Sequence, residues 1–71
     1  MMNTVRFLHD RTNNFYSCYN AEAEYIGQIY QDRGKWVFID DFIGEADFFD
    51  TLEEAKAFVL GLAEAAIERI G

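Results

Sequence analysis

The 71-residue chain contains no proline, one cysteine and one histidine. The lone cysteine, Cys18, has no partner for an internal disulfide, and one Cys with one His cannot supply the ligands of a zinc site. No apolar run approaches the roughly 18 residues of a membrane span, and no low-complexity tract or repeat divides the chain. We therefore expect a single domain over residues 1–71, located in the cytoplasm, without a membrane segment, metal or cofactor.

Basic residues are also scarce, since six Lys and Arg stand against 13 Asp and Glu, a formal net charge of −7. Residues 1–35 hold four of each sign, so the whole excess lies in residues 36–71, with two bases and nine acids. Binding to a nucleic-acid backbone relies on Lys and Arg that neutralise phosphates, so direct nucleic-acid binding is not expected. Acidic surfaces are attracted to basic ones, and we expect a protein partner with a basic surface.

Apolar residues are plentiful, with 51% hydrophobic and 17% aromatic side chains, which is enough to build a core in so short a chain. Four segments have the alternation or the β-branched and aromatic content of strands: 4–9, 15–20, 25–31 and 36–40. Polar residues at 10–14 predict a turn, and residues 32–35 predict a tight hairpin turn. Gly27, inside the third segment, marks either a bulge or the close approach of another element.

The residues after position 50 predict a helix. Thr51 and Glu54 have the spacing of a capping box, and the apolar residues that follow form one stripe at 100° per residue, opposite the acids. The stripe contains Leu52, Ala55, Val59, Leu62, Ala66 and Ile70. The predicted fold class is α+β, an antiparallel β-sheet (a meander of about four strands) packed on one C-terminal α-helix.

Nucleophilic catalysis is the first enzymatic possibility to test. If the first two strands pair, His9 and Cys18 could be neighbours, as a Cys–His nucleophile requires, but small cysteines in strands are usually buried. The chain has no serine elbow, glycine-rich phosphate loop or HExxH helix. We therefore predict that the protein is not an enzyme and assign no catalytic residue.

Residues 40–50 form an acidic segment without a basic residue. Its carboxylates are Asp40, Asp41, Glu45, Asp47 and Asp50. A calcium loop needs acidic ligands at alternate positions, and Phe42 stands where the second ligand should be. Two interpretations stay open, a solvated connection and an acidic surface that docks on a basic partner. For the second we assign Asp40, Asp41, Glu45 and Asp47 as candidate protein-binding residues.

The four tyrosines all lie in the second and third predicted strands: Tyr16, Tyr19, Tyr25 and Tyr30. Alternation puts Tyr25 on the opposite face from Tyr30, and Tyr16 opposite Tyr19, so each face carries two. One helix leaves one face uncovered, where tyrosines either pack across strands or form an interface such as that of a homodimer. Tyr25 and Tyr30 therefore join the candidate protein-binding residues.

The stretch 49–58, which follows the strand at 34–38, resembles two groups of small domains with a sheet followed by a helix. One is the three-stranded DNA-binding domain that occurs in plant proteins and in the arm-binding part of phage integrases. That family reads DNA with basic residues of its sheet, and the sheet of this chain is not basic. The other comprises short acidic phage proteins that inhibit bacterial defence, notably type I anti-CRISPR proteins. That resemblance implies a phage or mobile-element protein that acts as a nucleic-acid mimic on a basic CRISPR complex in the host cytoplasm. The alternative is a small homodimeric regulatory module, similar to an antitoxin.

Overall fold

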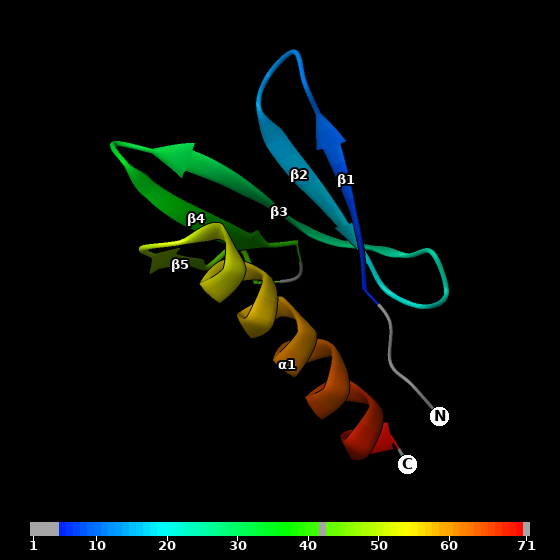
Figure 1. Cartoon of the computed structure of the whole chain (residues 1–71). Helices are drawn as coiled ribbons and strands as arrows, with labels where there is room; N and C mark the ends of the chain where they lie inside the picture. The colour runs from blue at the N-terminus through cyan, green and yellow to red at the C-terminus, as the bar shows by residue number, and fades with distance from the viewer. Residues whose placement is uncertain (1–4, 42, 71) are drawn as a thin grey trace.

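The computed structural model describes residues 5–41 and 43–70, and their side chains as far as residue 63. The described residues form a five-stranded antiparallel sheet and one helix (Figure 1). The elements are β1 (Arg6–Asp10), β2 (Phe15–Tyr19), β3 (Tyr25–Asp32), β4 (Lys35–Asp40), β5 (Ala46–Phe49) and α1 (Leu52–Ile70). The strands lie in chain order, which confirms the predicted α+β meander with a C-terminal helix. Among the described residues, no helix is both long and apolar enough to cross a membrane.

The fifth strand, β5, is one more than the sequence predicted. It is only four residues long and contains Asp47, a residue type depleted in strands. Tertiary contacts nevertheless hold it in the sheet, because it pairs with β4 along its whole length and Phe49 packs against the core. The ring centres of Phe49 and Phe58 of α1 are 5.2 Å apart. Pairing and packing therefore outweigh the weak local preference of this segment.

The predicted turns at 10–14 and 32–35 are confirmed. Between β3 and β4, Arg33 and Gly34 both have positive φ, 52° and 81°, the combination that a tight two-residue hairpin turn requires. Between β1 and β2, the carboxylate of Asp10 accepts hydrogen bonds from the backbone N–H groups of Thr12 (3.0 Å) and Asn13 (3.2 Å). Both hairpins are thus defined by interactions between residues close in sequence.

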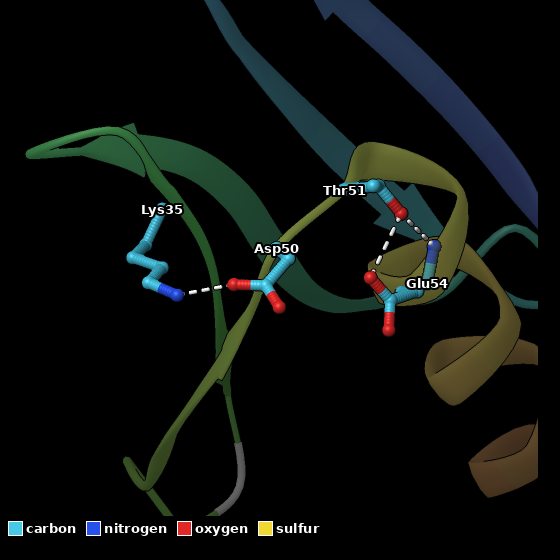
Figure 2. A network of polar contacts seen from close by, with 4 residues as sticks. All are labelled: Lys35, Asp50, Thr51 and Glu54. Atoms are coloured by element: carbon cyan, nitrogen blue, oxygen red, sulfur yellow. Dashed lines mark hydrogen bonds and ion pairs between the residues drawn. The ribbon is translucent and has the colours of Figure 1, made fainter.

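The helix begins at the predicted capping box. The Thr51 hydroxyl accepts the backbone N–H of Glu54 at 3.1 Å and donates to the carboxylate of Glu54 at 3.1 Å (Figure 2). Beside it, Asp50 forms an ion pair with Lys35 of β4. This pair lowers the pKa of Asp50 and raises that of Lys35. Both side chains are exposed, so the ion pair contributes little to stability, and the hydrogen bonds of Thr51 define the start of the helix.

The core lies between α1 and one face of the sheet, which we call the covered face. Its buried members are Val5, Cys18, Ile29, Phe38, Ala55 and Val59. Ala55 and Val59 confirm the predicted stripe, but Leu62 is 39% exposed and Ala63 packs inward instead. At about 100° per residue, Ala63 lies about 40° from the direction of Val59, whereas Leu62 lies about 60° away on the other side. The side chains of Ala66 and Ile70 lie outside the described residues.

A β-bulge interrupts the pairing of β2 with β3. Cys18 pairs with Gly27, but the next residue, Tyr19, pairs with Tyr25, so Ile26 is an extra residue in β3. Ile26 packs against the core, and β3 therefore turns two successive residues toward the covered face. As a consequence, the alternation of side chains before the bulge is shifted by one position relative to that after it.

Gly27 is also the site of a close approach, so both of its predicted roles are confirmed. A Cβ atom added there would stand 2.4 Å from the carbonyl oxygen of Ile39 and 2.6 Å from a ring carbon of Phe38. These distances are far shorter than van der Waals contact. The ring of Phe38 thus lies against the backbone of Gly27, and only glycine fits at this position.

No described element covers the second face of the sheet, which we call the open face (Figure 1). Its exposed apolar side chains include Leu8 (59% exposed), Ile39 (36%) and Phe48 (63%). Val37 also belongs to this face but is fully buried, because Tyr30 and Phe48 flank it in the register. The open face therefore has a small apolar cluster of its own and a partly exposed apolar surface around it.

Candidate protein-binding surface

Asp40 organises the turn between β4 and β5. Its side-chain Oδ1 accepts the backbone N–H of Ile43 at 3.3 Å, and its carbonyl oxygen accepts that of Gly44 at 2.9 Å. Its own N–H donates to the carbonyl of Glu45 at 3.1 Å. Gly44 has φ 71°, a conformation that favours glycine. Asp40 is half-buried, so of the four predicted acids it is the one that shapes the turn.

Asp41 and Glu45 are exposed in the same turn. The N–H of Asp41 donates to the carbonyl oxygen of Ile26 at 3.1 Å, which joins the turn to the start of β3. Tyr25 is the residue before Ile26, and its pKa is raised, first by burial and then by the negative charge of Asp41. The structure therefore brings together four of the predicted site residues: Asp40, Asp41, Glu45 and Tyr25.

Asp47 and Asp50 do not belong to this group. Asp47 pairs with Phe38, so its side chain lies on the covered side of β5, where an inward charge on an edge strand discourages pairing with other chains. Asp50 forms its ion pair with Lys35, at the start of β4. Within the described part of the chain, no three His, Cys, Asp or Glu side chains gather closely enough to hold a metal ion.

The prediction that Tyr25 and Tyr30 lie on opposite faces is wrong, and the bulge is the reason. Tyr25 pairs directly with Tyr19, and their rings meet edge to face with centres 5.8 Å apart. The hydroxyl of Tyr25 donates to the side chain of Gln28, also on the open face, at 3.3 Å. The open face therefore carries three tyrosines and the covered face carries only Tyr16. Tyr30 lies toward the far end of β3 from Tyr25.

The sequence prediction missed two acids, Glu22 and Glu24, in the turn between β2 and β3. Asn20 holds this turn, since its Oδ1 accepts the N–H groups of both glutamates at 2.9 Å and its Nδ2 donates to the Glu24 carboxylate at 3.0 Å. In a meander, alternate connections lie at the same end of the sheet. This turn therefore lies at the same end as the turn between β4 and β5. The strand order of the predicted meander already implied that the two turns lie together.

We call this end of the sheet the acidic end. It comprises Glu22, Glu24, Asp40, Asp41 and Glu45, together with Tyr25, and the start of β1 brings one base, Arg6, to the same end. At the opposite end, Asp10, Asp32 and Asp50 lie with Arg11, Arg33 and Lys35, and the first turn of α1 adds Glu53 and Glu54. The two ends thus differ in their bases, with one beside the five acids of the acidic end and three beside the five at the other, whereas the sequence suggested a division between the two halves of the chain.

His9 and Cys18 take structural positions. The ring of His9 stacks on Tyr16 with centres 4.5 Å apart, and its Nε2 lies 3.1 Å from the Asn14 side-chain oxygen. Cys18 is fully buried, and burial raises its pKa to about 12 against a smaller opposing effect of Lys56. Such a thiol lacks the thiolate character that a nucleophile needs at neutral pH.

The acidic end is thus a preformed surface of two hydrogen-bonded turns beside one tyrosine. Its carboxylates come from residues about twenty positions apart in the sequence and are brought together by strand pairing. In comparisons with known proteins, no protein-family model, curated protein or solved structure matches the chain.

Proposed function

We propose that the chain is a non-enzymatic protein-binding domain whose acidic end docks on a basic surface that its partner uses to bind nucleic acid. The supporting observation is that two separate turns place carboxylates at one end of the sheet. Neither turn, residues 20–24 or 41–45, contains Lys or Arg. Carboxylates in such a group offer Lys and Arg side chains the charge that phosphates otherwise provide.

The hydrogen bonds within both turns support this proposal. Asn20 and Asp40 fix the two turns through side-chain contacts, so little ordering is required when a partner binds. Tyr25, 38% exposed, adds a large amphipathic side chain next to the charges, of the type enriched in interfaces. Charge complementarity acts mainly on the association rate, whereas a central aromatic residue slows dissociation.

The resemblance to acidic phage proteins gives the proposal its specific form, a phage-encoded inhibitor of a CRISPR complex. Such complexes hold their nucleic acids in positively charged channels. An acidic domain bound at a channel of this kind competes with DNA. The proposed inhibitor therefore acts without binding nucleic acid itself.

The test is competition. Purified type I CRISPR complexes are mixed with the chain and then with labelled target DNA, and DNA binding is measured by mobility shift over a range of salt concentrations. We expect the chain to prevent the shift of at least one complex, with inhibition weakening as salt rises. Failure to inhibit any complex would contradict the specific form of the proposal. A shift of DNA by the chain alone would contradict the general one.

Two variants with equal net charge separate the acidic end from acidity in general. The first combines Glu22→Gln, Asp41→Asn and Glu45→Gln, and leaves Glu24 and Asp40 to hold the turns. The second combines Asp32→Asn, Asp47→Asn and Glu53→Gln, all exposed and outside the acidic end. Each neutralises three acids and changes the formal charge from −7 to −4. We expect only the first to slow association with the partner, and equal losses would show that overall charge is responsible.

A further inference from the structure

The outer edge of β1 is the least protected backbone in the sheet. β1 pairs only with β2, and no described element lies along its other side (Figure 1). The register with β2 runs without interruption from Arg6 to Asp10, so β1 has no bulge, and it contains neither proline nor lysine. Bulges, prolines and lysines are among the devices that proteins commonly use to prevent edge strands from pairing with another chain.

The side chains of β1 have a pattern that is complementary to itself. Arg6, Leu8 and Asp10 share the open face, with opposite charges on either side of an exposed leucine. When two copies of β1 pair antiparallel about a twofold axis at Leu8, Arg6 of each copy lies opposite Asp10 of the other. Leu8 then lies opposite its own equivalent, and opposite-charge and apolar pairs across strands are both stabilising.

The groups needed for this pairing are available. Arg6 makes no ion pair with another residue that the structure describes. Asp10 uses Oδ1 for the turn, whereas Oδ2 has only a 3.5 Å contact with the Asn13 amide. Centring the axis on Phe7 or His9 would place Leu8 opposite a charged residue, so the charges favour the register at Leu8.

The other edge of the sheet offers no such match. A twofold pair of β5 strands centred on Asp47 would place two carboxylates opposite each other, and like charges destabilise a strand pair. Centred on Phe48, the pair gains no opposite-charge contact. Pairing β1 of one copy with β5 of another is a heterologous contact, which builds a ring or a filament rather than a twofold dimer. Of the two edges, β1 is therefore the one suited to a closed dimer.

We propose that two copies of this chain pair through β1, antiparallel and centred on Leu8, to form one continuous sheet. The two helices then lie on the same side of that sheet, and the two open faces join on the other. The acidic ends point in opposite directions, so each stays accessible. This inference does not depend on the function proposed for the acidic end.

Cross-linking tests the register directly. In the proposed pair the two Leu8 side chains face each other, whereas an Arg6 side chain and its equivalent are about 13 Å apart. Under mild oxidation, Leu8→Cys should give a covalent dimer, and Arg6→Cys and Phe48→Cys should not. The wild-type chain is the blank, because its only cysteine is buried. Failure of Leu8→Cys to cross-link, or more efficient cross-linking through Phe48→Cys, would overturn the proposal.

Charge reversal tests the ion pairs. Arg6→Asp and Asp10→Lys each turn two attractive contacts into repulsive ones, so each variant alone should dimerise at least about tenfold more weakly than the wild type. Mixed together, the two variants regain both attractive contacts and should form a heterodimer. Sedimentation across a range of concentrations gives the mass of the wild type, of each variant alone and of the mixture. A wild-type mass that stays monomeric at every concentration, or a mixture that behaves as its separate components, would overturn the proposal.

Discussion

The two faces of the sheet are built from alternate residues of the same strands, yet they have different roles. Phe38 and Ile39 are neighbours in β4, but Phe38 is 1% exposed beneath α1 and Ile39 is 36% exposed on the open face. The helix contributes Ala55 and Val59 to the covered face, and no described element packs on the other. Burial of large apolar side chains is the main stabilising contribution to folding, so stability depends chiefly on the covered face.

The difference also explains where binding surfaces occur. Truncation of a residue packed under the helix costs stability, whereas the exposed residues of the open face and the turns are less constrained. Tyr25, Leu8 and the acidic turns all lie outside the covered core. The following predictions test this division, from the largest expected effect to the smallest.

The largest effect is expected for Phe38→Ala. Phe38 is almost completely buried and its ring also covers Gly27, so its truncation leaves a cavity and should reduce the free energy of unfolding by about 3–5 kcal/mol. Ile39→Ala is the control on the opposite face and should cost about 1 kcal/mol. Urea denaturation measures both. Equal losses would contradict the division between the two faces.

Gly27→Ala should be next. The new methyl group would collide with the Ile39 carbonyl oxygen and the Phe38 ring, and such overpacking costs about 1–3 kcal/mol. Gly61→Ala in α1 is the matched control, since no atom lies within 4 Å of a Cβ added there. It should instead stabilise the helix by up to about 1 kcal/mol. Thermal melts should show a lower melting temperature for Gly27→Ala and a higher one for Gly61→Ala. An unchanged melting temperature for Gly27→Ala would show that β3 can move away from Phe38.

Cys18 should make stability depend on alkaline pH. Its pKa is raised from 9.0 to about 12 by burial, so above pH 9 the unfolded chain releases the thiol proton first. The stability present below pH 9 is therefore lost as pH rises toward 12, by at most about 1.4 kcal/mol per pH unit. Denaturation of wild type and Cys18→Ala at pH 8 and pH 10 isolates this effect. The difference in free energy of unfolding between the two proteins should be smaller at pH 10 than at pH 8, and a constant difference would show that the thiol does not ionise on unfolding.

The smallest effect is expected for Phe48→Ser. Phe48 is 63% exposed and contributes mainly by flanking Val37, so the substitution should cost less than about 1 kcal/mol. Chemical denaturation again provides the measurement, with Phe38→Ala as the reference for a buried phenylalanine. A loss approaching that of Phe38→Ala would mean that the open face has a core as important as the covered one.

Local interactions explain the features that sequence reasoning predicted correctly. The helix start depends on Thr51 and Glu54, three residues apart, and the hairpin between β3 and β4 depends on Arg33 and Gly34. The candidate site was predicted only in part. Four predicted residues come together, namely Asp40, Asp41, Glu45 and Tyr25. Asp47, however, lies on the covered side of β5, and Tyr30 lies toward the other end of β3.

The remaining features depend on pairing between distant segments. β5 exists because β4 supplies its hydrogen bonds and α1 packs on Phe49, which the short sequence of β5 does not reveal. The face of Tyr25 depends on a single extra residue, Ile26, because side chains in a strand alternate and one added residue reverses every face before it. The grouping of Glu22 with Asp41 likewise follows from the order of strands in the sheet.

The sequence by itself therefore determined the fold class, the hairpin turns, the helix start and the acidic character of the chain, since these depend on composition or on residues within a few positions of each other. Only the tertiary structure decided which side chains share a face and which charges share an end. These relationships depend on strand register and strand order, which the turns set together with the packing of the strands on one another and on the helix, so no single segment reveals them.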